Sequence, residues 1–345
     1  MTTPHAAPEF DPARLDAFLR ARIPGLSGPM DLVRVGGGQS NPTFFLSYGD
    51  RRLVLRKRPP GTLLPSAHAV DREYRVMQAL AATDVPVPRM LVFCDDPSVV
   101  GTAFYVMERI EGRVFADCWL LGVEPAHRRA MFLDMADTLA RLHAVDWRAQ
   151  GLQDFGRAER YFERQIARWA RQWELSKTGD SADIDALLRW LPAHIPPDAS
   201  TTLTHGDFRI GNLIFHPEEP RVVGVLDWEL STLGHPLADL AFSALAWQLL
   251  PTEYMGMRGM DHEALGIPAV EDYLQRYSDR RPSVPRMTTF HTAFALFRLA
   301  VIFEGIAARQ RDTATPPSQS GILPTRTRAA YACRAVELIA HASDL

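Results

Sequence analysis

The chain has 345 residues, 46% of them hydrophobic, with 38 Lys and Arg against 41 Asp and Glu. This is enough apolar material for a globular core, and the length favours two lobes or domains. The formal net charge of −3 gives no basic surface of the kind that binds nucleic-acid phosphates or acidic lipids. We therefore expect a small-molecule partner, with no nucleic acid and no membrane.

The cysteines and the N-terminus point to a reducing compartment. Cys94, Cys118 and Cys333 are far apart and form no C-x-x-C pair, which argues against a disulfide framework or a zinc site. Residues 1–20 lack the apolar core of a signal peptide, and the longest apolar run, LAFSALAWQLL, is too short to cross a bilayer. We expect a cytoplasmic protein, either a monomer or a homodimer.

The first part of the chain has the pattern of a small sheet with helices. Strand, glycine-rich turn, strand, tight turn and strand follow one another within residues 30–61, which predicts an antiparallel meander. The expected elements in this part are a helix at 11–23, the meander at 30–61, a helix at 68–83, and strands at 87–96 and 101–112.

From residue 126 the pattern changes to helices, interrupted by one hairpin. Helices are expected at 126–146, 160–176, 183–191, 235–250, 271–280 and 289–310, with a polar, proline-bearing loop at 311–326 before a last helix. The fold class expected is α+β and bilobal. Residues 1–111 would form a β-rich N-lobe and residues 112–345 a mostly helical C-lobe.

The hairpin places three polar residues close together. Its apolar runs, LIF and RVVGVLDW, are separated by a turn at residues 216–220, so Asn212 before the first run and Asp227 near the end of the second should lie side by side. Oxygen ligands of this kind suit Mg²⁺, which completes its shell with phosphate and water. Asp207 lies five residues before Asn212. One Asp at an attacking hydroxyl, with an Asn and a second Asp at a metal ion, is the set that phosphoryl transfer requires.

The motif H-G-D-x-x-x-x-N, followed by an apolar strand and Asp, resembles the catalytic segment of the aminoglycoside phosphotransferase and choline kinase families, which are relatives of protein kinases. The resemblance extends over residues 30–310. The segments LTHGDFRIGN and VLDWELSTLGHPLADLA are most similar to the kinase domains fused to acyl-CoA dehydrogenases. The resemblance implies a protein-kinase-like fold with ATP between the lobes, Asp207 as the catalytic base, and Asn212 and Asp227 as Mg²⁺ ligands.

The N-lobe contains weaker matches. The turn at residues 36–41 includes Gly37, Gly38, Ser40 and Asn41, whose backbone could approach a phosphate, although alone it is an ordinary flexible hairpin. Arg56 ends the third strand, where kinases place a phosphate-holding Lys.

Two adjacent cations compete for the lysine position. Strand alternation favours Arg56 over Lys57, although a solvated basic edge strand is an alternative. Glu73 should lie on the inward face of its helix, where a carboxylate requires a cation, and Arg56 would supply it. Glu108 and Ile110 follow Tyr105-Val106-Met107, where a kinase linker would offer backbone groups to adenine.

Three further features have a structural interpretation. The literal D-F-G triplet at residues 154–156 precedes the H-G-D loop, so we expect it to be a turn leading into a helix and not the metal site. Asp239 resembles the family's Asp that braces the catalytic loop, and it could alternatively interact with a helix dipole. His205 is expected to support the same loop, since no second His stands at metal-ligand spacing.

These features predict an ATP-dependent phosphotransferase acting on a hydroxyl of a small molecule. Arg209, Arg298 and Arg309 suggest a hydroxy acid or a hydroxyacyl thioester as acceptor, although Arg209 could instead pair with a neighbouring carboxylate. The alternatives are an aminoglycoside-type antibiotic kinase and a catalytically inactive, kinase-like nucleotide-binding scaffold. A metal-dependent hydrolase is disfavoured because no histidine cluster completes a metal shell.

Overall fold

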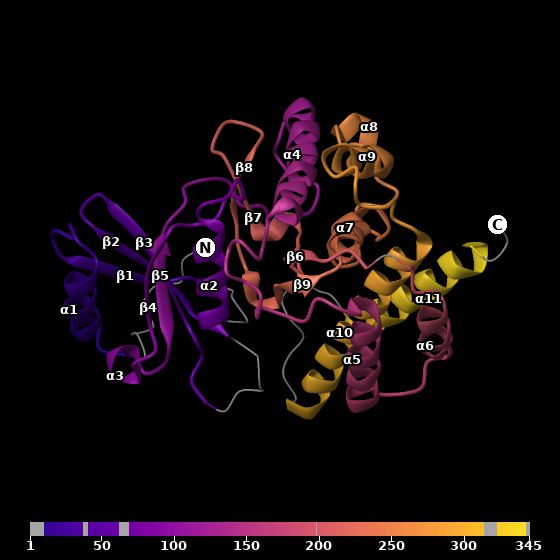
Figure 1. The fold of residues 1–345 in the computed structure, drawn as a ribbon, viewed down its shortest axis with the longest axis horizontal. Helices are drawn as coiled ribbons and strands as arrows, with labels where there is room; N and C mark the ends of the chain where they lie inside the picture. The colour runs from indigo at the N-terminus through magenta and orange to yellow at the C-terminus, as the bar shows by residue number, and fades with distance from the viewer. Residues whose placement is uncertain (1–9, 37–40, 62–68, 198, 314–322, 343–345) are drawn as a thin grey trace.

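The structure is a computed structural model that describes residues 10–36, 41–61, 69–197, 199–313 and 323–342. It has two parts, a five-stranded sheet with its helices on the left of Figure 1 and a helical part on the right. The α+β, bilobal, kinase-like fold expected from the sequence is confirmed. Gly37, Gly38 and Ser40 lie outside the described residues.

The sheet is entirely antiparallel, with strand order β1-β2-β3-β5-β4. Its strands are β1 (Met30–Arg34), β2 (Thr43–Tyr48), β3 (Arg51–Lys57), β4 (Met90–Cys94) and β5 (Phe104–Glu108). Its helices are α1 (Pro12–Arg22), α2 (Val70–Leu80) and the short α3 (Pro97–Val100). The predicted meander and both long helices are present, whereas α3 was not expected because four residues carry too little periodicity.

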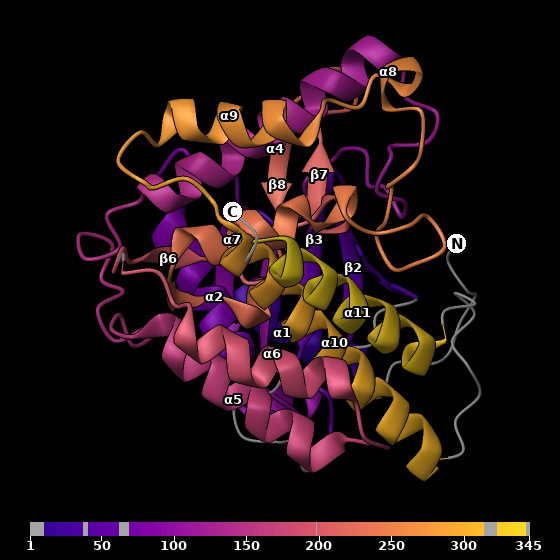
Figure 2. The same ribbon diagram turned by 90° about the vertical axis from the view of Figure 1, so that its right-hand side faces the viewer.

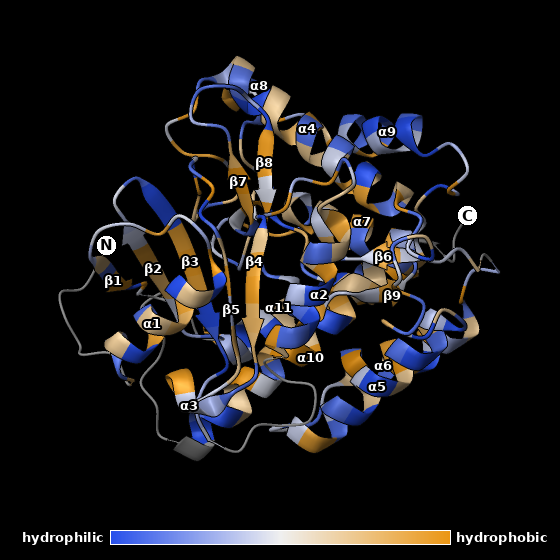
Figure 3. Cartoon of the chain, turned by 60° about the vertical axis from the view of Figure 1, so that its left-hand side comes forward, coloured by the Kyte–Doolittle hydropathy of each residue, from blue (hydrophilic) through white to orange (hydrophobic). Residues whose placement is uncertain are grey.

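Side-chain alternation along β3 and β5 gives the sheet two apolar faces, each covered by a different helix. Leu55 and Val106 pack with Leu15 and Leu19 of α1. On the other face, Val54 and Tyr105 belong to a cluster with α2. Figure 3 shows the hydrophobic colouring of these strands. Since α2 covers the face nearer the helical part, its polar residues can reach the junction between the two parts.

The helical part is built around long helices that pack side by side, as Figure 2 shows for α5, α6, α10 and α11. Its helices are α4 (Pro125–Ala144), α5 (Tyr161–Ser176), α6 (Ala182–Ala193), α7 (Pro236–Ala244), α8 (His262–Leu265), α9 (Val270–Arg280), α10 (Thr289–Thr313) and α11 (Pro324–Ala342). Its short 3₁₀ turns are η1 (Ile210–Asn212), η2 (Trp228–Leu230) and η3 (Leu245–Trp247).

Two small hairpin-like sheets lie at the junction. The predicted hairpin is confirmed as β7 (Leu213–Phe215) paired antiparallel with β8 (Val222–Val225). The sequence did not predict the second sheet, β6 (Thr202–Thr204) with β9 (Thr232–Gly234), because its three-residue strands pair across about thirty residues. These two sheets carry the loop and the turn that contain the H-G-D motif and Asp227.

The helix α10 is long and apolar enough to cross a membrane by length and composition, with a mean hydropathy of 1.5 over its candidate span. However, 78% of that stretch is buried inside the protein, and core helices pass the same test. Within it, the buried Glu304 pairs with the half-buried Arg328, and the buried Arg298 donates to the carbonyl oxygen of Gly206. The helix therefore serves as the core of the helical part.

Candidate active site

The H-G-D loop, between β6 and η1, is held by a buried carboxylate. Asp239, near the start of α7, accepts hydrogen bonds from the backbone N–H groups of His205 (2.5 Å) and Gly206 (2.8 Å). The buried Arg298 of α10 donates to the carbonyl oxygen of Gly206 at 2.6 Å. The bracing expected of Asp239 is thus confirmed, whereas Arg298 is committed to the loop and is not available to an acceptor.

Gly206 is required by both space and conformation. Its φ of +85° favours glycine, and an added Cβ would lie 2.6 Å from the carbonyl oxygen of Leu230. The ring Nε2 of His205 lies 2.9 Å from the carbonyl oxygen of Leu226, after β8. His205 therefore ties the loop to the segment that carries Asp227, in agreement with the structural role expected for it.

Asp207, Asn212 and Arg209 form a compact group. The amide nitrogen of Asn212 donates to the carboxylate oxygen Oδ2 of Asp207 at 2.7 Å and to its carbonyl oxygen at 2.8 Å. Arg209 donates from Nε to the same Oδ2 at 3.3 Å. The alternative in which Arg209 pairs with a neighbouring carboxylate is therefore the one observed. Because the nitrogen of Asn212 faces Asp207, its oxygen faces away from that carboxylate.

Asp227 lies beside this group, as the hairpin pattern predicted. The backbone N–H of Leu226 donates to the carbonyl oxygen of Asn212 at 2.8 Å, which joins the two ends of the hairpin. Asp227 adopts a left-handed backbone conformation, with φ of 67° and ψ of 59°. This conformation is strained for a residue with a Cβ, and such residues cluster at functional sites.

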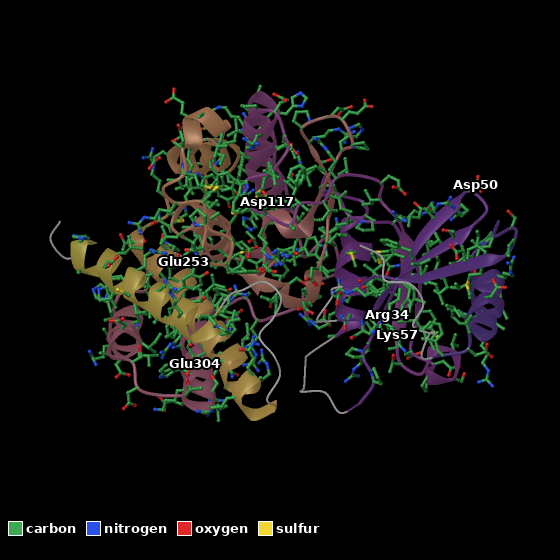
Figure 4. The ribbon with its side chains drawn as sticks, turned by 180° about the vertical axis from the view of Figure 1, so that it is seen from behind. Arg34, Asp50, Lys57, Asp117, Glu253 and Glu304 are labelled. Carbon is green, nitrogen blue, oxygen red and sulfur yellow. The ribbon has the colours of Figure 1, made fainter. Side chains whose placement is uncertain are left out.

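Arg56 joins the sheet to the helical part. Its Nη2 lies 2.7 Å from Oδ1 of Asp227, and its Nη1 lies 3.3 Å from Oε2 of the fully buried Glu73 in α2. Lys57 lies on the opposite face of β3 and donates to the carbonyl oxygen of Val100; Figure 4 labels it on the sheet side. The predicted pairing of Glu73 with Arg56 is confirmed. Arg56 and not Lys57 points toward Glu73 and Asp227, as strand alternation predicted, and its contact with a phosphate stays a prediction.

Glu73 has two further partners. Asn41 donates from Nδ2 to Oε1 at 2.7 Å, and the hydroxyl of Tyr105 donates to Oε2 at 2.9 Å. Burial raises the pKa of Glu73 to about 7, and Arg56 and Tyr105 act in the opposite direction. In this structure Asn41, which the sequence suggested as a phosphate contact, has its amide directed at Glu73.

The helix α2 is anchored to the helical part by two arginines at the literal D-F-G triplet. Arg72 donates to the carbonyl oxygens of Phe155 (2.7 Å) and Ser231 (3.3 Å), and its guanidinium lies over the Phe155 ring. Arg75 forms an ion pair with Asp154. Asp154 therefore pairs with Arg75 and has a different part from Asp227. The triplet forms a turn, as expected, but it does not lead directly into a helix, because α5 begins at Tyr161. The triplet fixes the helix that carries Glu73.

The end of β5 and the segment after it contain the residues that the sequence predicted to contact adenine. The carboxylate of Glu108 pairs with Arg89 (3.4 Å) and Arg51 (3.7 Å), and its backbone N–H donates to the carbonyl oxygen of Arg89. The side chain of Ile110 contacts Gly224 of β8 so closely that an added Cβ there would lie 2.8 Å away. Both side chains therefore have structural partners, and an adenine contact at this segment stays a prediction.

A buried chain of side chains behind Asp239 was not expected from the sequence. Nε2 of His143, in α4, lies 3.4 Å from Oδ2 of Asp239, and Nδ1 lies 2.7 Å from the hydroxyl of Tyr277 in α9. Burial lowers the pKa of His143, although Asp239 opposes it, so the ring is neutral at pH 7. Nε2–H then donates to Asp239 while Nδ1 accepts from Tyr277, which fixes the tautomer.

The donor set can be tested against the metal that the family resemblance implies. Among the described residues, no three His, Cys, Asp or Glu side chains gather in a way that could hold an ion by themselves. One carboxylate, Asp227, and one amide, Asn212, at the two joined ends of the hairpin do suit Mg²⁺, which uses few protein ligands together with phosphate and water. The set fits a metal that arrives with a nucleotide.

Replacing Arg56 by Gln is expected to destabilise the protein by about 3 to 5 kcal/mol, because it leaves the buried Glu73 without its cation. A carboxyl whose folded pKa is raised contributes stability below its unfolded pKa and loses it as the pH rises. In the wild type this loss ends near the folded pKa of about 7. Without Arg56 the pKa goes higher, so the difference between the two proteins should grow above about pH 7.

Chemical denaturation on both sides of pH 7 measures this effect, with two controls. Arg56→Lys keeps the charge and should lose less stability than Arg56→Gln. Adding Glu73→Gln to Arg56→Gln removes the titrating group and should abolish the additional loss at alkaline pH. A loss for Arg56→Gln that is the same on both sides of pH 7 would contradict the role assigned to the pair.

Comparisons with known proteins agree with this geometry. Residues 31–284 match the profile of the phosphotransferase enzyme family (APH). Mouse acyl-CoA dehydrogenase family member 10 is 46% identical over 306 residues, which are 86% of this chain and 28% of that protein. Rat acyl-CoA dehydrogenase family member 11 is 42% identical over 310 residues, which are 87% of this chain and 40% of that protein. The chain thus spans well under half the length of either relative.

Solved structures give the same result. A Ralstonia eutropha protein, provisionally described as an aminoglycoside phosphotransferase, is 42% identical, with a TM-score of 0.87 and coverage of 96% of this chain and 99% of that one. Aminoglycoside phosphotransferase APH(4)-Ia, in a ternary complex with AMP-PNP and hygromycin B, shares the fold at 16% identity, with a TM-score of 0.62 and coverage of 93% and 97%. The matched profile and the Ralstonia structure together establish that this chain belongs to the phosphotransferase enzyme family.

Proposed function

We propose that this protein transfers the γ-phosphoryl group of ATP to a hydroxyl group of a small molecule. The observation that carries the proposal is the placement of Asp207 and Asn212, joined by a side-chain hydrogen bond, beside the hairpin end that carries Asp227, which pairs with Arg56. The loop and the hairpin bring these polar residues together next to a strained backbone. Such an arrangement costs stability, which argues for a functional reason.

Each residue has a defined part in the proposed reaction. Asp207 orients the acceptor hydroxyl and takes its proton as the oxygen forms a bond to the γ-phosphorus and the bond to ADP breaks. Asn212 and Asp227 would hold Mg²⁺, whose charge neutralises the phosphate oxygens. Arg56, held by Glu73, would contact the α- and β-phosphates, a task for which its planar, permanently charged guanidinium is suited.

The acceptor is proposed to be a hydroxy acid or a hydroxyacyl thioester. A polycationic aminoglycoside would require carboxylates that are open to it. The two carboxylates that line the cavity beside the catalytic loop, labelled in Figure 4, both have partners. Asp117 accepts from the backbone N–H groups of Trp119 and Leu121, and Glu253 pairs with Arg334 at 2.7 Å.

Replacing Asp207 by Asn should lower kcat on the order of 10²- to 10⁴-fold, because the general base is lost. Asp227→Ala should abolish magnesium-dependent turnover, since it removes the carboxylate ligand proposed for the metal. Both are measured by coupled ADP release. Asp50→Ala, at an exposed carboxylate in the turn between β2 and β3, is the matched control and should change kcat by no more than about 2-fold.

Retained turnover in Asp227→Ala would overturn the metal assignment. A thermal shift with ATP and Mg²⁺ but no turnover with any acceptor would instead indicate the inactive, nucleotide-binding scaffold. The acceptor screen should include aminoglycosides, choline, sugars and hydroxy acids with their thioesters. We expect turnover with the last group; turnover with polycationic sugars alone would overturn the acid proposal.

Tyr277→Phe should lower kcat by about 5-fold with little change in KM for ATP, because losing one buried hydrogen bond, about 1 kcal/mol, loosens His143 and through it Asp239. Steady-state kinetics measures the effect. Tyr273→Phe is the matched control on the same helix, since its hydroxyl bonds to Ser243 and not to this chain. Equal kcat losses in the two variants would show that Tyr277 acts only through stability.

A further inference from the structure

A cavity of about 390 Å³ lies in the helical part, between the catalytic loop, α4, the end of α7 and the segment at residues 251–256. Its volume falls in the range of small-molecule sites. The side chains that form its walls are mostly apolar and come from segments far apart in the sequence. They include Phe132, Met135, Phe242, Ala246, Trp247 and Tyr254.

Several polar groups in these walls are already paired. The hydroxyl of Ser243 lies 2.6 Å from that of Tyr273, and Nε1 of Trp247 donates to the carbonyl oxygen of Pro268 at 2.9 Å. Cys118 donates from Sγ to the carbonyl oxygen of Gly256 at 3.2 Å. Each of these groups already has a hydrogen-bond partner within the protein, so a ligand there meets mainly hydrocarbon and aromatic surface.

One side chain in the wall of the cavity also contacts the proposed base. Arg209, Ile210 and Gly211 of the catalytic loop form part of its wall. Arg209 lies over the ring of Tyr254, 5.6 Å from its centroid, while its Nε contacts Asp207. Asp207, the guanidinium of Arg209 and the apolar cavity therefore follow one another in space.

We propose that this cavity binds an aliphatic chain of the acceptor, so that the enzyme selects hydroxylated acyl compounds by the length of their hydrocarbon chain. The inference rests on the proposed function and deepens it. With the hydroxyl at Asp207, the chain passes Arg209 and enters the cavity. Burying each methylene group stabilises the complex, whereas a sugar would bury hydroxyl groups against walls that offer them few partners.

The first test is a series of straight-chain hydroxy acids that keep the hydroxyl at the same distance from the carboxyl group and differ in chain length. With the wild-type protein, kcat/KM should rise by about 4-fold for each added methylene group until the cavity is full. A kcat/KM that is independent of chain length would overturn the inference.

The second test fills the cavity. Ala246→Leu should lower kcat/KM for the longest acceptors by at least about 10-fold and leave the shortest acceptor unchanged, which also shows that the variant is folded. Ala144→Leu, the same change at an exposed position at the end of α4, should leave the whole series unchanged. Equal losses at all lengths in Ala246→Leu would overturn the inference.

A binding measurement separates this inference from the proposed function. Octanoate, which has no hydroxyl group to phosphorylate, should bind to the wild-type protein and change the fluorescence of Trp119 and Trp247, which line the cavity. Ala246→Leu should weaken this binding. If octanoate binds in this way but no acceptor is phosphorylated, the cavity assignment stands and the proposed function fails. If acceptors are phosphorylated but octanoate does not bind, the proposed function stands and the cavity assignment fails.

Discussion

One guanidinium group links the sheet, the helix α2 and the hairpin at the junction of the two parts of this protein. Arg56 contacts Glu73 on one side and Asp227 on the other, at 3.3 and 2.7 Å. Its charge makes the burial of Glu73 tolerable, and Glu73 in turn ties α2 to β3. A lysine has one nitrogen at the end of its chain, whereas the planar fork of arginine presents separate N–H groups to two carboxylates. The position of α2 and the position of the Asp227 carboxylate thus depend on the same side chain, Arg56.

A second buried charge organises the other half of the site. Asp239 accepts from two consecutive backbone N–H groups, while Arg298 holds the carbonyl oxygen of Gly206. The loop is therefore held at both the N–H and the carbonyl group of Gly206. Asp239 is itself contacted by the ring of His143, whose other nitrogen contacts the hydroxyl of Tyr277. Catalytic geometry of this precision requires such supporting contacts.

Local patterns in the sequence predicted much of this arrangement. The meander and the 213–225 hairpin follow from alternation and turn residues, and the convergence of Asn212 with Asp227 follows from the hairpin. The β6 and β9 strands and the contact of His143 with Tyr277 could not be predicted, because they join segments that meet only after folding. The burial of Arg298 had a signal, because it is the one Lys or Arg in the apolar stretch 289–308 and a cation there needs a buried partner.

The two arginines that anchor α2 have a consequence for control of this protein. In protein kinases, activity is switched by the position of the equivalent helix. Here Arg72 and Arg75 fasten the helix to the turn at Asp154 and Phe155, and an outward swing would have to break both contacts. Such a clamp keeps the helix assembled, so that the output of the proposed enzyme would follow the supply of its two substrates and would not wait for an activating signal.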